Sequence, residues 1–434
     1  MIRYFPIIIL QFYLLMTLII FRFGPISYYV EFPIIFWGFI TMYHICFFGG
    51  YLYAIKSTKQ IIYPNVLIGN KISKNSIKIV MFFAIIASFM GMKQFAFQQL
   101  INPSVLYNSV LAGLINPGEQ YTLKMVSVSL NNTGDKIFNI LLFFIVFSKV
   151  VLIPILVLTW HRLSLSMKII GLIATLLPVL SSISNGTNKA VFDFLIFYSS
   201  SLLCFFIYNR YKVGKFNFNS RKFFLIISII AFIGAFSFFG LAIGQRGGSV
   251  ANIEMQSPLG HIKLNSYTQN YNNYGFYWYL YTWFSNYLIQ GYYGFSLSLS
   301  ESFETTFGFG NSVFFMRQFQ WLTGIDLTTR TYQYKIDKYW DYSAQWHSFY
   351  AHYANDFHFA GVSIVCVLIG VLLGKIWLSV LYNSNIFGFI LLPIFALLII
   401  FIPANNQIFG MHETTSAFFI VLSAWLLSRH KIIF

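Results

Sequence analysis

Long apolar runs recur along the whole chain, and they constrain its fold more than any other feature. Many have about 18 or more residues, the length that an α-helix needs to cross the hydrocarbon core of a bilayer. Only 9% of the 434 residues are charged, whereas soluble domains carry roughly 25%. So few charges could not cover the surface of a soluble protein of this size. The sequence therefore predicts an all-α, polytopic membrane protein.

About ten membrane-spanning helices are expected, or 11–12 if part of the largest loop also enters the membrane. The expected spans are 5–22, 33–55, 78–99, 137–160, 168–184, 190–208, 222–243, 359–376, 386–402 and 415–428. The first run follows Arg3 as in a signal peptide, but no small-residue cleavage site comes after it. We therefore interpret it as a retained span. The whole chain, 1–434, is expected to form one membrane domain.

The distribution of charge predicts the orientation, because Lys and Arg favour the cytoplasmic side of a membrane. Three connections, 56–78, 161–168 and 209–222, are rich in Lys and Arg and contain no Asp or Glu. Acidic residues fall on or near the opposite side. Both termini are therefore expected in the cytoplasm. The formal net charge of +16 follows from this topology, so no nucleic-acid partner is expected.

Two connections on the outer side are long. The smaller, 100–136, is polar and contains two Asn-Pro pairs, and it is expected to be a loop. The larger, 244–358, is a periplasmic loop rich in Trp and Tyr. Within it, 276–300 is itself apolar and aromatic. This segment is either a helix lying flat at the interface or a re-entrant pair that protein buries.

The GQRGG motif at 244–248, where a span leaves the membrane, is the first candidate site. The planar guanidinium of Arg246 suits phosphate oxygens, and the glycines let backbone N–H groups approach an anion. The alternative is a helix-end turn with an Arg that reaches to the interface. Arg317 and Arg330 are further candidates for anion binding, with a solvated surface role as their alternative.

A second candidate site precedes the span at 359–376 and contains His347, His352 and Asp356. In a helix, His352 and Asp356 share one face, and a His oriented by a carboxylate can act as general base towards a sugar hydroxyl. The spacing does not match the HExxH zinc arrangement, so neither a metal nor another cofactor is expected. The alternative is a set of aromatic and His side chains that anchors the span at the interface.

A third candidate is Lys189, which follows a tight turn and lies four residues before Asp193. This spacing allows an ion pair on one helix face. A charge within a span indicates function, whereas the alternative is a local pair that stabilises the helix end. Lys149 lies near the middle of a span and is expected to face a partner or a wet cavity.

Four segments resemble a known family, the Wzy-type O-antigen polymerases, which join oligosaccharide repeat units of bacterial surface polysaccharides. They are GTNKAVFDF at 186–194, GQRGG at 244–248, GYYGFSLSLSESFETTFGFGNS at 291–312 and HSFYAHYANDFHFAG at 347–361. The resemblance implies transfer of the growing glycan from undecaprenyl pyrophosphate to the next lipid-linked repeat unit. It implies metal-independent, inverting glycosyl transfer at the periplasmic face of the inner membrane.

The resemblance also implies that periplasmic arginines hold the pyrophosphate. We assign this role to Arg246 first and Arg317 second, with Lys189 and Arg330 as further candidates. The chain departs from the family's Arg-x10-Gly pattern, since Ser or Thr stands eleven residues after Arg246 and Arg317. Expected partners are the undecaprenyl-pyrophosphate-linked oligosaccharide, membrane lipid and a chain-length regulator protein.

Two other functions remain as alternatives. An O-antigen ligase would share the large outer loop but would attach the glycan to lipid A–core. A flippase for lipid-linked oligosaccharides, which is a transporter and not an enzyme, is expected to have short loops, whereas 244–358 is long. A chain-length regulator itself usually has two spans, which does not fit this chain.

Overall fold

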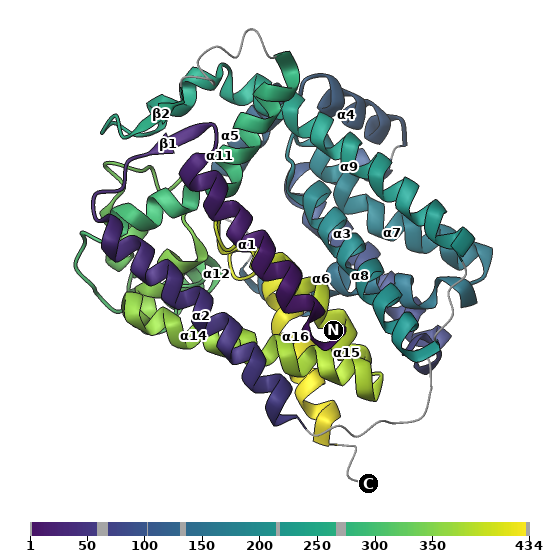
Figure 1. The fold of residues 1–434 in the computed structure, drawn as a ribbon. Helices are drawn as coiled ribbons and strands as arrows, with labels where there is room; N and C mark the ends of the chain where they lie inside the picture. The colour runs from purple at the N-terminus through teal and green to yellow at the C-terminus, as the bar shows by residue number, and fades with distance from the viewer. Residues whose placement is uncertain are drawn as a thin grey trace. The chain divides into compact units, whose positions relative to one another are not determined.

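The computed structural model describes residues 2–58, 68–101, 103–130, 136–213, 218–265 and 275–430. Its secondary structure is almost entirely helical (Figure 1). Within these ranges, seven helices are long and apolar enough to cross a membrane: Ile2–Phe23, Pro33–Ser57, Leu141–Arg162, Leu165–Ser184, Lys189–Lys212, Ile229–Gly247 and Phe349–Asn383. The prediction of an all-α, polytopic membrane protein is confirmed.

The expected number of about ten spans is not confirmed. The other three expected spans are helices, namely α3 (Lys74–Ile101), α15 (Ile386–Ile400) and α16 (His412–His430). The 15 residues of α15 rise by about 22 Å, which is less than the roughly 30 Å of hydrocarbon. Polar residues in the end turns of α16 shorten its apolar stretch.

The chain forms two compact units. Unit 1 contains Met1–Gln60, Ser249–Leu378 and Phe395–Met411, and unit 2 contains Ile61–Gly248, Ser379–Ile394 and His412–Phe434. The outer loop expected at 244–358 therefore lies almost wholly in unit 1. Buried aromatic residues of this loop pack against the membrane helices of the same unit.

Helices α1 (Phe5–Phe23), α2 (Pro33–Ser57) and α14 (Phe349–Asn383) contribute long apolar segments to unit 1. Figure 1 shows α2 beside the first part of α14. A Cβ atom on Gly50 would lie 2.2 Å from the carbonyl oxygen of Val367, and one on Gly370 would lie 2.2 Å from that of Phe47. Only glycine permits this approach, and small residues bring membrane helices together in the same way.

Helix α14 is interrupted at His358, whose φ and ψ of 58° and 165° are not helical. This conformation is essentially confined to glycine elsewhere. The kink separates Phe349–Phe357 from the apolar part of the helix and lies next to 359, where the span was expected to begin; the helix that could cross a membrane extends over Phe349–Asn383. The candidate residues His352 and Asp356 lie before the kink.

The described part of the large loop adds several short elements to unit 1. They are η4 (Val250–Gln256), β2 (Ile262–Leu264), α11 (Gly275–Ser298), α12 (Val313–Thr323), η6 (Thr328–Arg330) and α13 (Tyr332–Lys335). Strand β2 pairs antiparallel with β1 (Ile26–Tyr28), and Ser27 lies opposite Lys263. This two-stranded ribbon ties the loop to the chain segment that follows α1.

Helix α11 decides how 276–300 is arranged. It is one continuous helix of 24 residues, so the expectation of a re-entrant pair is wrong. Gly291 lies within this helix, and its missing side chain admits the backbones of Ala404 and Ser348. The second half of α11 is buried, and Tyr292 Oη lies 3.1 Å from Oγ1 of Thr17 in α1.

Unit 2 is built around α6 (Lys136–Thr159), which contacts α3, α16, α7 (Leu165–Ser184) and α8 (Lys189–Val213). Helix α9 (Phe218–Gly247) packs on α8. The remaining short helices of the two units are η1 (Ile2–Tyr4), η2 (Ile68–Lys71) and η3 (Trp160–Arg162).

Most of the outer connection 100–136 forms α4 (Pro103–Ile115) and α5 (Pro117–Leu130). The prolines of its two Asn-Pro pairs are the first residues of these helices. Proline suits the first helical position because its missing N–H would have no partner there. Helix α5 contacts α9 and brings polar side chains to the end of that helix.

Candidate functional site

Arg246 lies in the last turn of α9, just before Gly248, whose φ of 66° ends the helix. Its Nε donates a hydrogen bond to the carbonyl oxygen of Ala242 at 3.0 Å. Its guanidinium carbon lies 4.6 Å from the centroid of the Tyr121 ring in α5. Cation–π attraction favours this geometry and keeps the Arg246 guanidinium beside α5.

Gln245 fixes the turn between α4 and α5 against the end of α9. Its Oε1 accepts a hydrogen bond from the backbone N–H of Gly118 at 2.9 Å, and its Nε2 donates one to the carbonyl oxygen of Ile115 at 3.0 Å. A hollow of about 700 Å³ lies beside this turn, and Arg246 and Tyr121 are among its lining residues. Its size falls within the range of small-molecule sites.

Lys124 is a further cation at this end of unit 2. Its Nζ lies 6.0 Å from the centroid of the Tyr121 ring. Burial, and then the positive charges of Arg246 and Lys189, lower the pKa of the Lys124 ammonium below its usual range. Arg246 and Lys189, which the sequence singled out, therefore both lie near Lys124. We call Lys124, Lys189 and Arg246 the basic cluster.

Lys189 stands at the first position of α8 and forms two ion pairs. Its Nζ lies 2.7 Å from Oδ2 of Asp193 and 3.0 Å from Oε1 of Glu413. The expected i,i+4 pair with Asp193 is therefore present, and Glu413 joins it from α16. Lys149, which was expected to face a partner or a wet cavity, lines a small cavity of about 40 Å³ together with the two acidic residues.

The turn before α8 explains why residues of α5 and α8 lie near one another. Gly186 has a φ of 59°, and a Cβ atom there would lie 1.9 Å from the carbonyl oxygen of Pro117. Ser182 and Thr187 close the turn by hydrogen bonds between their side chains and backbones. The start of α5 can therefore rest directly on this turn, which places the first residues of α8 beside α5.

In unit 1, Asp356 organises the segment 306–311. Its Oδ1 accepts hydrogen bonds from the Thr306 hydroxyl and from the backbone N–H groups of Gly308 (2.9 Å) and Gly310 (3.0 Å). Its Oδ2 accepts two more from the Asn311 backbone N–H (3.0 Å) and side-chain amide (2.9 Å). These hydrogen bonds fix the backbone of 306–311 around the Asp356 carboxylate.

His352 lies one turn before Asp356 in α14, and its side chain hydrogen-bonds to that of Asn405. The residues share a helix face as the sequence predicts, but the five hydrogen bonds that Asp356 accepts come from 306–311. An amide, and not a carboxylate, therefore hydrogen-bonds to the imidazole. His352 as a whole residue is half-buried.

His347 is almost completely buried, with 3% of its surface exposed, and its ring centroid lies 6.4 Å from that of His352. Neither of its ring nitrogens has a hydrogen-bond partner among the described residues. Burial, and then the nearby His352, hold the pKa of His347 well below its usual range. It is therefore a neutral imidazole at physiological pH.

The two other arginines that the sequence singled out lie in unit 1 and outside the basic cluster. Arg317 is exposed on α12. The guanidinium carbon of Arg330 lies 5.3 Å from the centroid of the Phe307 ring. Phe307 has a φ of 57°, which is uncommon for a bulky residue, and it belongs to the segment that Asp356 holds.

The candidate residues thus form two groups, one in each unit. Unit 2 brings together Arg246 and Lys189, and unit 1 brings together His347, His352 and Asp356. The sequence did not single out Lys124, because 100–136 was treated as a loop. A signal was present, since Tyr121 and Lys124 are three residues apart and share a face once this segment is helical.

Comparisons of the chain with protein-family models, with characterised proteins and with solved structures gave no match.

Proposed function

We propose that this chain is a membrane glycosyltransferase that polymerises undecaprenyl-pyrophosphate-linked oligosaccharide repeat units into a surface polysaccharide. The observation that carries the proposal is the basic cluster in unit 2. Lys124 lies close enough to Arg246 and Lys189 to feel both positive charges, and Arg246 lines a hollow of about 700 Å³. A pyrophosphate is a ligand of suitable charge and size for such a site.

The proposed reaction needs this charge. A hydroxyl of the acceptor sugar attacks the anomeric carbon of the donor glycan, and the bond from that carbon to the pyrophosphate oxygen breaks. The hydroxyl proton passes to a base, and undecaprenyl pyrophosphate leaves with the bonding electrons. Preorganised cations stabilise the negative charge that develops on the leaving group. Arg246 contributes a planar fork for two oxygens and Lys124 adds positive charge, whereas the charge of Lys189 is already paired with Asp193 and Glu413.

In unit 1, His352 is our candidate for the base. His352 is half-buried and its ring is oriented by Asn405, which suits a group that must meet a hydroxyl in a fixed geometry. His347 is neutral, but its burial leaves it out of reach of substrate. For Asp356 we propose a positioning role, because its carboxylate holds 306–311.

The proposed location is the inner membrane of a bacterium, with both termini in the cytoplasm. The support is the sequence distribution of Lys and Arg, which gather in the connections 56–78, 161–168 and 209–222. This orientation places the end of α9, and with it Arg246, on the periplasmic side. A lipid-linked substrate would present its pyrophosphate at that level of the membrane.

The test is complementation of a strain that lacks the gene, with the surface polysaccharide resolved as a ladder. Arg246→Ala should reduce the ladder to a single repeat unit at normal protein level, because loss of a preorganised cation costs about 100-fold or more in rate. Arg246→Lys should restore part of the ladder. The matched control is Lys338→Ala, which removes an exposed cation over another tyrosine, Tyr339.

The distribution of products separates the proposed function from its alternatives. A full ladder in Arg246→Ala would exclude the pyrophosphate role of this residue. Long glycan that accumulates on undecaprenyl pyrophosphate, without transfer to lipid A–core, would identify a ligase. Repeat units that accumulate on the cytoplasmic side would identify a flippase. A normal ladder in His352→Ala would remove His352 as the base.

A further inference from the structure

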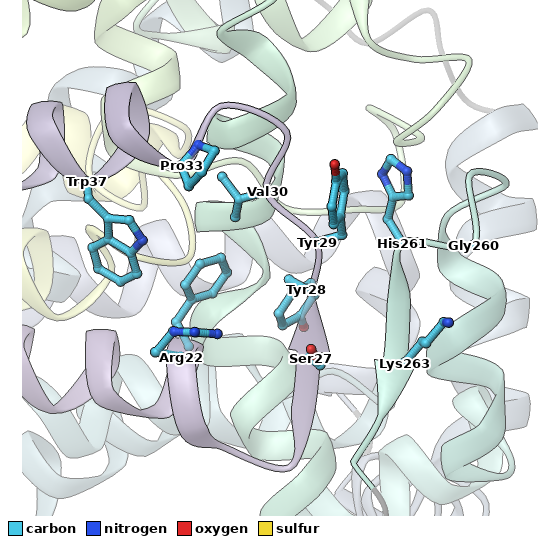
Figure 2. A pocket seen from close by; sticks show the side chains of 11 residues that line it. Arg22, Ser27, Tyr28, Tyr29, Val30, Pro33, Trp37, Gly260, His261 and Lys263 are labelled. Atoms are coloured by element: carbon cyan, nitrogen blue, oxygen red, sulfur yellow. The ribbon is translucent and has the colours of Figure 1, made fainter.

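Unit 1 contains a second pocket, distinct from the residues considered so far. It has a volume of about 680 Å³ and is lined by the end of α1, the β1–β2 ribbon and the start of α2 (Figure 2). Its size is within the range of small-molecule sites. Neither the basic cluster nor the His347–Asp356 group contributes a lining residue.

The ribbon is a fixed wall of this pocket. Residues alternate between buried and exposed along both strands, which leaves Ser27 and Lys263 opposite each other on the exposed face. Tyr28 anchors the other face, because its hydroxyl donates a hydrogen bond to Oδ1 of Asn286 at 2.7 Å and its ring stacks on Phe21 at 5.3 Å. The pocket is therefore preformed, which lowers the entropic cost of binding.

The polar groups that line the pocket select for an anion. Arg22 and Lys263 are exposed cations from different elements, and Figure 2 shows them on opposite sides of Ser27 and Tyr28. His261 adds an Nδ1 atom that has no hydrogen-bond partner among the described residues. The described lining residues include no Asp or Glu. An arginine, a lysine and an imidazole together suit phosphate oxygens.

The aromatic groups that line the pocket select for a ring with apolar faces. Trp37 is half-buried beside Phe21, with ring centroids 6.4 Å apart. Tyr29 is 57% exposed, and its ring lies 4.7 Å from that of His261. Figure 2 shows Trp37 and Tyr29 at different sides of the pocket. Exposed aromatic faces beside cations fit a sugar that carries a phosphate.

The surroundings of the pocket favour a ligand that is attached to a lipid. Phe23 follows Arg22 and is 72% exposed, and Ile34 follows Pro33 and is 88% exposed. Both adjoin candidate membrane spans, so these apolar side chains can face lipid. A headgroup in the pocket could therefore keep its hydrocarbon chain in the bilayer, where burial of its methylenes stabilises the bound lipid.

We propose that this pocket binds the phosphate-bearing sugar headgroup of a membrane glycolipid, with the anion on Arg22 and Lys263 and the sugar against Trp37. The identity of the glycolipid rests on the proposed function. A polymerase needs two lipid-linked oligosaccharides at once, and the pocket in unit 1 holds a second one in addition to that of the basic cluster.

The test counts bound lipids on the purified full chain in phosphatidylcholine nanodiscs by native mass spectrometry. The probe is undecaprenyl pyrophosphate that carries one N-acetylglucosamine. The double variant Arg22→Ala/Lys263→Ala should bind one lipid fewer than the wild type, and Lys338→Ala should bind the same number. Trp37→Phe should keep the site, whereas Trp37→Ala should weaken binding of the sugar-bearing lipid about tenfold, as loss of 1.4 kcal/mol implies.

Two further probes distinguish the sources of the anion. Undecaprenyl pyrophosphate without sugar should bind the wild type more weakly, and inorganic pyrophosphate should not compete at equal concentration. An unchanged lipid count in Arg22→Ala/Lys263→Ala would overturn the proposal. Equal competition by inorganic pyrophosphate would overturn the lipid part of it. Equal affinity for lipids with and without sugar would overturn the role of Trp37.

The outcome is independent of the proposed function. If the pocket variant loses one lipid while Arg246→Ala still polymerises normally, the glycolipid site stands and the proposed role of Arg246 fails. If Arg246→Ala abolishes polymerisation while the pocket variant keeps the wild-type lipid count, the proposed function stands and the second site fails.

Discussion

Replacement of Asp356 by alanine removes the acceptor of five hydrogen bonds from 306–311. Hydrogen bonds to charged groups each contribute about 1.5–3 kcal/mol to stability, but their sum overstates the effect. Gly308 is exposed and Asn311 is half-buried, so their donors can turn to water. The Thr306 hydroxyl keeps a second acceptor, the Asn355 carbonyl oxygen at 3.0 Å. Only the N–H of buried Gly310 loses its partner completely.

We therefore expect Asp356→Ala to lower the free energy of unfolding by about 2–4 kcal/mol, in the range of a broken buried network. Asp356→Asn should cost about 1–2 kcal/mol, because one oxygen remains to accept hydrogen bonds. The exposed Asp326 is the matched control, since its carboxylate accepts one hydrogen bond, from the N–H of Thr328 at 2.8 Å. Asp326→Ala should cost at most about 1 kcal/mol.

The assay is thermal unfolding of the detergent-purified protein, combined with limited proteolysis between residues 299 and 312. Asp356→Ala should unfold several degrees below Asp326→Ala and should be cut faster in this segment. An unfolding midpoint and a cleavage rate equal to those of Asp326→Ala would refute the positioning role. A variant Asp356→Asn that keeps wild-type stability but loses all polymerisation would assign Asp356 to the chemistry instead.

Three further predictions concern unit 2. Lys189→Met should lower the free energy of unfolding by about 2–4 kcal/mol, since two carboxylates lose their shared partner. Thermal unfolding at neutral and acidic pH should show this difference from the wild type become smaller as the carboxylates protonate. Gly186→Ala should cost about 2–4 kcal/mol, because the added Cβ meets the Pro117 carbonyl oxygen in a left-handed turn; Gly234→Ala, where the Cβ meets nothing within 4 Å, should be neutral or stabilising in the same unfolding assay. Binding of inorganic pyrophosphate should weaken as pH rises through the lowered pKa of Lys124, because the ammonium must be charged to bind an anion. Calorimetry on Lys124→Arg should show this loss of affinity at a higher pH than in the wild type. A pH dependence identical to that of the wild type would contradict the role of Lys124.

The sequence was a reliable guide to features that arise within one segment. Apolar runs predicted the positions of the helices, and Lys189 and Asp193 form the ion pair that their spacing allows. The kink at His358 also lies next to 359, where the late span was expected to begin. All of these depend on helix periodicity and hydrophobicity, which are local properties.

Segments whose sequence is compatible with more than one structure were predicted less well. The Asn-Pro pairs in 100–136 indicate a turn or a helix start equally, and the structure has two helices there. The aromatic segment 276–300 has enough apolar character for either a helix or a re-entrant pair, and packing of α11 against α1 accompanies a single helix. In both cases the local sequence did not favour one of the two possible structures strongly enough to predict it.

Composition and local pattern by themselves determined that this chain is a helical membrane protein and where most of its helices lie. Only the tertiary structure decided which side chains meet. Glu413 reaches Lys189 across 224 positions in the sequence, and Asp356 holds donors from 306–311. The ribbon of the second pocket joins Ser27 to Lys263. Such pairs depend on how distant helices and strands pack, and no periodicity within a single segment encodes that packing.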